Sequence, residues 1–262
     1  MRRVALKIAY EGVGFCGSQY QPGLPTVVGD MIRDLQTVCK GKDAEWFDIK
    51  PSSRTDAGVN SLGNVVAINT EFKDDSTLLK ALNSVSDSIY YLGAADVPDD
   101  FNPRYANERI YRYILPSDGL DIDKAKECSS LFIGEHDFVM FCKVYEEKPT
   151  VTSIDSIDVV EKAGYLELTF RARFFLWNII RKMVAAIRAV ASGDNSLDDV
   201  RDALEGKVVN FGIARPDALT LLEVRYDGLE FTPADPSVFK GRLIEEQHRL
   251  ILRKGFLDSL KL

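Results

Sequence analysis

Residues 166–191 read LELTFRARFFLWNIIRKMVAAIRAVA, and this stretch indicates how the chain folds. From Leu166 to Phe174 every second residue is apolar, which is the pattern of a strand with one face in a core. From Trp177 to Ala191 apolar residues recur every three or four positions instead, which predicts an amphipathic helix. Because each element needs a core on one side, the stretch indicates an α+β protein.

Both patterns recur along the rest of the chain. Alternating or apolar runs predict further strands at residues 4–10, 64–69, 88–95, 111–115, 155–160 and 220–226. Helical spacing predicts further helices at residues 28–39, 77–85, 124–131 and 198–204, the first of them capped by Thr26. We expect strand 4–10 to be buried on one face only, because Val4, Leu6, Ile8 and Tyr10 alternate with other residue types.

The order of these elements favours one open, mostly antiparallel central sheet flanked by helices, since it does not follow a strict βαβ repeat. The loop at residues 97–103 contains two prolines and predicts a boundary. We therefore expect two similar-sized α/β halves, residues 1–107 and residues 108–262.

The composition is that of an ordinary globular chain, with 262 residues, 45% hydrophobic and 28% charged. No stretch approaches the ~20 apolar residues of a membrane-spanning helix, and the N-terminus lacks the core of a signal peptide. We therefore expect no membrane association and a cytoplasmic location. The four cysteines form no CxxC pair, and neither of the two histidines has a partner at ligand spacing, so we expect neither a disulfide framework nor a metal site.

The positive charges are concentrated although the formal net charge is −7. Between Phe170 and Val190 there is no acidic residue, and this segment contains five basic ones: Arg171, Arg173, Arg181, Lys182 and Arg188. A second basic group interleaves with tyrosines and consists of Arg104, Arg109 and Arg112 beside Tyr105, Tyr111 and Tyr113. Basic residues mixed with aromatic ones favour contact with RNA, whereas a solvated charged face is the alternative.

A turn-rich loop at residues 54–59 reads RTDAGV and places Asp56 between an arginine and a glycine. The aspartate could be a turn residue that binds its own backbone. An ionised carboxylate beside an arginine could instead act as a nucleophile, a base or an electrostatic stabiliser at an electron-poor sugar carbon.

This loop and six other segments resemble the tRNA pseudouridine synthase A family, whose signature reads RTDxGV. The other matching segments occur in the family order at residues 10–19, 26–29, 100–113, 134–138, 175–181 and 218–226. The chain departs from the bacterial pattern at Asn60, where a histidine is common, and residues 60–64 look more like archaeal members. Ala185 and Ala218 replace glycines of the family pattern.

The resemblance implies the pseudouridine synthase fold and an isomerase that converts uridine to pseudouridine in the anticodon stem-loop of tRNA, at positions 38, 39 and 40. It implies tRNA and a second copy of the chain as partners. The reaction breaks the N1–C1′ bond, turns the uracil and joins C5 to C1′, so it implies no metal and no small-molecule cofactor.

The resemblance also assigns three catalytic residues, Asp56, Arg181 and Tyr111. Asp56 would be the nucleophile at C1′ or the base that leads to a glycal intermediate, and Arg181 would hold it by a charge-assisted bond. Tyr111 would stack on the target base, with Leu219 on the other face. From the residues alone, Arg181 could be an exposed helix charge, Tyr111 a half-buried strand aromatic and Leu219 a core leucine.

The target uridine must leave its stack before a carboxylate can reach its C1′. Arg54, in the same loop as Asp56, is the candidate that assists this flipping. The candidates for contact with the phosphates are Arg104, Arg112, Arg173, Lys182 and Arg188. Two rival functions remain: an N-glycosidase, in which water completes the reaction, and a non-catalytic RNA-binding protein on the same fold.

Overall fold

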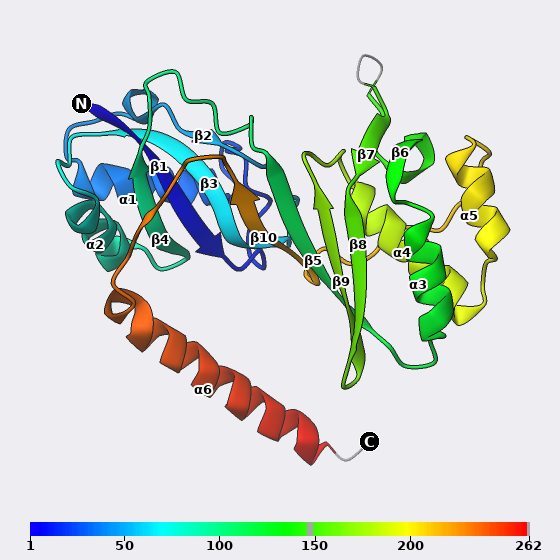
Figure 1. Cartoon of the computed structure of the whole chain (residues 1–262). Coiled ribbons are helices and arrows are strands. Elements are labelled where there is room, and N and C mark those ends of the chain that lie inside the picture. Colours follow the sequence, from blue (N-terminus) through cyan, green and yellow to red (C-terminus); the bar gives the residue numbers. More distant parts are fainter. Residues whose placement is uncertain (146–148, 261–262) are drawn as a thin grey trace.

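One long sheet runs through the molecule, as the computed structural model of residues 1–145 and 149–260 shows (Figure 1). In these residues it has nine strands, of which eight follow the order β11-β4-β1-β3-β10-β5-β9-β8 and β2 pairs with β3. The strands are β1 (Arg2–Tyr10), β2 (Lys50–Pro51), β3 (Asn60–Thr70), β4 (Ile89–Asp96), β5 (Glu108–Pro116), β8 (Ser156–Lys162), β9 (Tyr165–Ala172), β10 (Leu219–Arg225) and β11 (Thr232–Pro233). A separate two-stranded sheet pairs β6 (Gly134–Asp137) with β7 (Val151–Ile154).

The pairing confirms the predicted α+β class with a mostly antiparallel sheet. β10 pairs with β3 in parallel, and the other strand pairs of the described residues are antiparallel. β10 comes late in the chain but lies between β3 and β5, so it joins the early and the late strands into one sheet (Figure 1).

Six helices lie among the described residues; the first five pack against the sheet or its hydrophobic clusters, whereas the last stands mostly apart from the strands. They are α1 (Val27–Val38), α2 (Asp75–Val85), α3 (Ile122–Ser130), α4 (Ile179–Ser192), α5 (Leu197–Leu204) and α6 (Ser237–Ser259), with short 3-10 turns η1 (Glu45–Phe47) and η2 (Val139–Phe141). The predicted cap of α1 is confirmed, since the Thr26 side chain accepts a hydrogen bond from the Gly29 N–H at 3.2 Å. Among the described residues, no helix has the length and apolar character needed to cross a membrane.

Two hydrophobic clusters lie under the sheet. One is built from β1, β3 and β4 with α1 and α2, and the other from β5, β8 and β9 with α3 and α4. After β10 the chain returns to the first cluster, because β11 pairs with β4 and Ala234 packs there. The predicted division at residues 107 and 108 stays a prediction.

The predicted half-burial of strand 4–10 is wrong. β1 lies between β3 and β4, and it is buried on both faces, with Val4 in one cluster and Ala5 in the other. The buried guanidinium of Arg3 forms an ion pair with Asp48 at 3.0 Å and a hydrogen bond to Asn69 at 2.9 Å. Both faces of β1 are covered by other parts of the chain, so the alternation of residue types did not predict its burial.

The connection from β9 to α4 also differs from the prediction. β9 ends at Ala172, so Phe174 is exposed, and α4 begins at Ile179 rather than at Trp177. Asn178 has a left-handed backbone with φ of 67°, which separates Trp177 from the helix. The chain therefore makes a tight turn here, and this turn builds part of the site described next.

Candidate active site

The loop that contains Asp56 connects β2 to β3 and is fixed by contacts with the first strand and the loop that follows it. The backbone of Thr55 donates to the Ser18 hydroxyl at 2.8 Å and accepts from the Ser18 N–H at 3.0 Å. The Thr55 and Tyr10 hydroxyls lie 2.9 Å apart, and both side chains are buried. Hydrogen bonds with Ser18 and Tyr10 therefore fix Thr55, the residue directly before Asp56.

Asn60 ties three segments together. Its side-chain oxygen accepts from the Gly12 N–H at 2.8 Å, and its amide donates to the Asp217 carbonyl at 2.8 Å. Gly12 has to be a glycine, because a Cβ at this position would lie 2.3 Å from the Val59 carbonyl oxygen. The turn after Asp56 is thus braced by residues from both ends of the chain.

The Asp56 carboxylate is bound by two donors from the α4 region. Arg181 Nη1 lies 3.3 Å from Oδ2, and the indole Nε1 of Trp177 donates to Oδ1 at 2.7 Å. The Arg181 side chain is 16% exposed and the Asp56 side chain 27% exposed, so the ion pair is partly shielded from water. The two simpler interpretations are therefore wrong: in the described residues Asp56 does not bind its own turn through its side chain, and Arg181 is not an exposed helix charge.

A second contact fixes Arg181 itself. Its Nε donates to the Ala214 carbonyl at 2.8 Å, and the Ala214 N–H donates to the Arg181 carbonyl at 3.0 Å. The guanidinium is therefore oriented before any substrate arrives.

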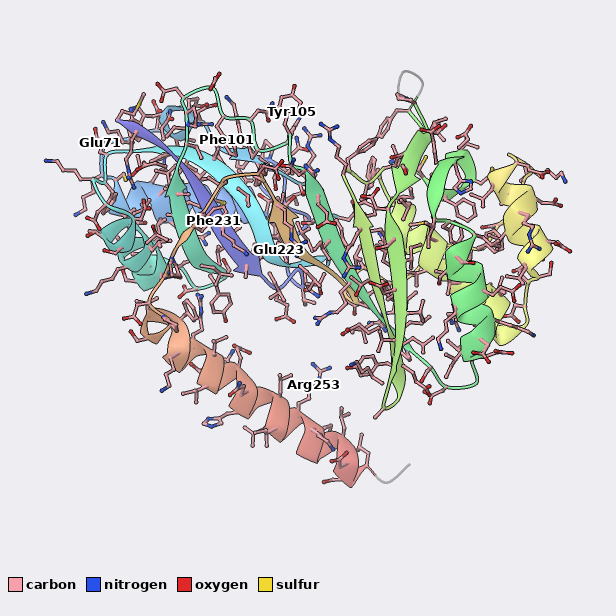
Figure 2. The ribbon with its side chains drawn as sticks, in the orientation of Figure 1. Glu71, Phe101, Tyr105, Glu223, Phe231 and Arg253 are labelled. Carbon is pink, nitrogen blue, oxygen red and sulfur yellow. The ribbon has the colours of Figure 1, made fainter. Side chains whose placement is uncertain are left out.

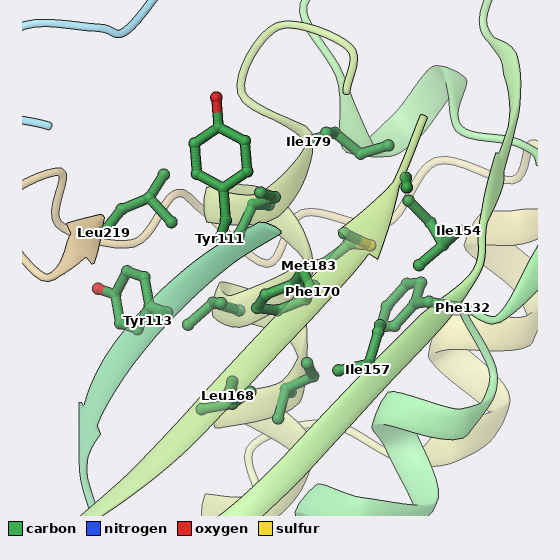
Figure 3. Close-up of a cluster of buried hydrophobic side chains, with 14 of the residues drawn as sticks. Tyr111, Tyr113, Phe132, Ile154, Ile157, Leu168, Phe170, Ile179, Met183 and Leu219 are labelled. Carbon is green, nitrogen blue, oxygen red and sulfur yellow. The ribbon is translucent and has the colours of Figure 1, made fainter. Parts of the chain in front are cut away.

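Tyr111 and Leu219 stand side by side at the margin of the second hydrophobic cluster. Figure 3 shows the Tyr111 hydroxyl pointing away from the other labelled side chains, with Leu219 next to the ring. The Phe175 ring meets the Tyr111 ring edge-on, with centroids 5.1 Å apart. Burial raises the pKa of Tyr111 well above its ordinary value, and the negative charge of Asp56 acts in the same direction. Tyr111 is therefore a neutral phenol at physiological pH, within electrostatic reach of Asp56.

Arg109 is a part of the site that the sequence analysis noted as basic but gave no role. Its guanidinium is buried and donates to the Ser53 hydroxyl at 3.0 Å, the Ser52 carbonyl at 3.0 Å, the Arg104 carbonyl at 2.9 Å and the Arg173 carbonyl. Desolvation lowers the pKa of Arg109, and in the described residues no carboxylate pairs with it. The residue joins the Asp56 loop to β5 and to the end of β9.

The remaining predicted contact residues fall into two groups. Arg54, Arg104, Arg173 and Arg188 have exposed side chains. Arg112 instead lies beside Tyr111 on β5 and so points to the other face of the sheet, 3.8 Å from Glu167. The Lys182 ammonium donates to the Met140 carbonyl at 3.2 Å and the Cys142 carbonyl at 2.9 Å, so it anchors η2 and the residue that follows it.

The arrangement combines an oriented carboxylate, a guanidinium and a neutral phenol. Among the described residues, no three His, Cys, Asp or Glu side chains come together as a group that could hold a metal ion. An oriented carboxylate can attack or deprotonate a sugar, and a phenol beside it can move a proton. These are the functional groups of an enzyme that acts on a glycosidic bond.

Comparison with known proteins identifies the class. A family model described as tRNA pseudouridine synthase matches residues 129–227. Curated relatives named tRNA pseudouridine synthase A include that of Pyrococcus abyssi, 41% identical over 97% of both chains, and that of Pyrococcus horikoshii, 40% identical over 97% of both chains. That of Methanocella arvoryzae is 38% identical over 87% of this chain and 86% of its own length.

Among solved structures, the crystal structure of a Cbf5-Nop10-Gar1 complex matches 71% of this chain and 45% of that chain, with a TM-score of 0.36 and 11% identity. This similarity is too low to inform the site. The sequence relatives define a pseudouridine synthase, which is an isomerase. The chain belongs to the tRNA pseudouridine synthase A family, as the motifs predicted.

Proposed function

We propose that the chain acts in the cytoplasm on the anticodon stem-loop of tRNA and converts uridine to pseudouridine at positions 38, 39 and 40. The names of the curated relatives support tRNA as the substrate. The observation that carries the proposal is the Asp56 carboxylate, which an arginine from the other half of the chain holds at 3.3 Å. Tyr111 and Leu219 adjoin this pair.

The reaction is a rearrangement in which the base stays on the enzyme. Asp56 either attacks C1′ or removes a sugar proton to give a glycal, and in both cases the N1–C1′ bond breaks. After the uracil turns, C5 bonds to C1′ as the bond from C1′ to Asp56 breaks or, on the glycal route, as Asp56 returns the proton to the sugar. The C5 proton then leaves and N1 gains a proton, so the composition of the RNA does not change. Arg181 keeps the carboxylate in place through both bond changes.

The uracil sits between Tyr111 and Leu219 while it turns. A flipped base loses its stacking partners in the RNA, and an aromatic ring with an apolar side chain opposite replaces them. The Tyr111 hydroxyl, a neutral phenol, takes part in the transfer of the C5 proton. Arg54 is exposed next to Asp56 and assists the flipping by contact with the backbone of the loop.

The exposed arginines at 104, 173 and 188 bind phosphates. Because such contacts position the RNA and do not read its sequence, their loss weakens binding without changing the chemical step. Arg112 and Lys182 have partners within the chain, so we assign the phosphate contacts to the three exposed arginines.

The enzyme works as a homodimer, and α6 supplies a surface for it. Leu243, Leu250 and Leu257 are exposed and recur every seven residues on this helix, and none of its 23 residues, all of which the structure describes, is buried. In an antiparallel pair of α6 helices centred on Leu250, Leu243 of one copy would face Leu257 of the second copy. Glu246 would then face Lys254 of the second copy, so charge and apolar surface are both self-complementary.

The dimer is tested by sedimentation of the wild type and of Leu250→Glu. We expect a dimer for the wild type and a monomer for the variant, because the substitution places a charge at the centre of the helix pair. Val208→Glu is the matched control, since Val208 is also exposed but lies outside α6. A dimer that persists in Leu250→Glu would exclude this interface.

The reaction is tested with a tRNA transcript and the wild-type chain without added metal. We expect pseudouridine at positions 38, 39 and 40 of transcripts that carry uridine there, and no release of base. Free uracil with an abasic site would identify an N-glycosidase. Tight binding of tRNA without either product would identify an RNA-binding protein.

A further inference from the structure

Trp177 makes the shorter of the two contacts to the Asp56 carboxylate. Its indole N–H donates to Oδ1 at 2.7 Å, whereas Arg181 reaches Oδ2 at 3.3 Å. The sequence analysis counted Trp177 as an apolar residue of the helix, but the side chain is 42% exposed and does not lie in a core. The function described above gives this tryptophan no role.

The turn before α4 aims the indole at Asp56. Asn178 adopts a left-handed conformation that is uncommon for a residue with a side chain, and this conformation takes Trp177 off the helix. The Lys143 N–H donates to the Trp177 carbonyl at 2.9 Å and fixes the backbone of the turn. Strained backbone at a site of this kind persists because the surrounding contacts maintain it.

Two further contacts hold the indole ring. The Tyr145 ring stacks on Trp177 at an interplanar angle of 16° and a centroid distance of 5.5 Å. The Lys143 ammonium lies 4.0 Å from the centroid of the indole, on which it exerts a cation–π attraction. A cation over the ring also draws electron density from the indole and makes its N–H a stronger donor.

We propose that Trp177 is a positioning residue that fixes the plane of the Asp56 carboxylate. A single donor on one oxygen leaves the carboxylate free to rotate about its Cβ–Cγ bond. Donors on both oxygens, from Arg181 and Trp177, remove this freedom. The remaining lone pairs of the carboxylate then keep one fixed direction for the reaction with the substrate. Since the rate of a bond-forming step depends steeply on the position of the attacking atom, the indole contributes to turnover without touching the substrate.

The inference rests on the proposed role of Asp56. Three variants distinguish the role of Trp177 from that of Asp56. Trp177→Phe keeps an aromatic ring but removes the N–H donor. Trp177→His restores a donor, because the imidazole overlays the five-membered ring of indole and places Nε2 where Nε1 was. Asp56→Asn tests the carboxylate itself.

We expect Trp177→Phe to lower kcat by about ten- to a hundredfold, as the loss of a hydrogen bond to a charged group and of its alignment predicts. The dissociation constant for tRNA should stay within about twofold, because the charge that attracts phosphates is unchanged. Trp177→His should return kcat to within about threefold of wild type, because it restores the donor to Asp56. Trp46→Phe is the matched control, since Trp46 is the other tryptophan of the chain and lies outside the site.

Fluorescence gives a readout that a packing role would not move. In a Trp46→Phe background all tryptophan emission comes from Trp177. We expect Asp56→Ala to change the emission maximum and intensity in this background, because the acceptor of the indole N–H is gone. Asp123→Ala, which removes an exposed carboxylate on α3, should leave the emission unchanged.

Three outcomes would overturn the inference: full activity in Trp177→Phe, equal losses in Trp177→Phe and Trp177→His, or emission that does not respond to Asp56→Ala. Full activity in Asp56→Asn would instead overturn the proposed function. Loss of activity in Asp56→Asn with full activity in Trp177→Phe would leave the proposed function standing and exclude the role of Trp177.

Discussion

The loop around Asp56 and the helix α6 differ in how many contacts they make with the rest of the chain. Hydrogen bonds from β1, β5, the first loop and the segment before β10 brace the loop at residues 52–60. The N-terminal part of α6 is attached to the connection between α2 and β4 through Arg242, whose guanidinium donates to the Ser86 and Ile89 carbonyls. Beyond it the helix around Arg253 stands apart from the sheet (Figure 2).

This difference separates what stabilises the fold from what serves a partner. The loop holds a carboxylate in one orientation, and many elements share that task, so single changes there alter both stability and turnover. The side chains of α6 gain little within their own chain, so changes there alter stability weakly. The following predictions test this contrast, from the largest expected effect to the smallest.

Arg181→Ala should lower kcat by about a hundredfold or more, because the Asp56 carboxylate loses the cation that holds it. Unfolding free energy should fall by about 1 kcal/mol, since the pair is partly exposed and the hydrogen bond from Arg181 to the Ala214 carbonyl is also lost. The measurement is the rate of tritium release from 5-³H-uridine tRNA in a single turnover. Arg188→Ala, two turns further along α4, is the comparison and should weaken tRNA binding while the rate at saturation is kept.

Arg109→Met should lower the free energy of unfolding by about 3 kcal/mol, because four acceptors, two of them in buried hydrogen bonds, lose their donor together. Urea unfolding gives the value. Arg215→Met should cost less than about 0.5 kcal/mol, since its ion pair with Asp217 is exposed at the arginine. Equal losses in the two variants would contradict the bracing role of Arg109.

Gly12→Ala and Gly241→Ala compare the same substitution in the two regions. In Gly12→Ala the new Cβ meets the Val59 backbone at 2.3 Å, so the turn after Asp56 must move. We expect a loss of about 2 kcal/mol together with slower turnover. In Gly241→Ala nothing lies within 4 Å of the new Cβ on an exposed helix, so stability should rise by up to about 1 kcal/mol. Thermal melting of both variants measures whether stability falls in Gly12→Ala and rises in Gly241→Ala.

Local patterns in the sequence predicted most of the regular elements because hydrophobic period and capping are local properties. The cap at Thr26 and the helices at residues 77–85 and 198–204 needed no tertiary information. Burial of β1 on both faces depends on the segments that pack over the two faces of the sheet, which the sequence of the strand does not encode. The helix α6 went unpredicted, although Leu243, Leu250 and Leu257 carry a helical spacing that could have revealed it.

The candidate site divides in a similar way. Motifs predicted Asp56 and Arg181, and the structure brings them together. Trp177 and Arg109 were missed as site residues. The position of Trp177 depends on the tight turn before α4, and the position of Arg109 depends on carbonyls of three separate segments. The interleaved tyrosines pointed to the Arg109 region, but residue type alone could not distinguish its buried guanidinium from the exposed one of Arg104.

The most direct test of the account is tritium release from 5-³H-uridine tRNA by the wild type and by Asp56→Asn at saturating enzyme, with tRNA binding measured in the same samples. The account predicts release by the wild type, none by Asp56→Asn, and equal binding by both. Release by Asp56→Asn at the wild-type rate would contradict the assignment of the bond rearrangement to this carboxylate.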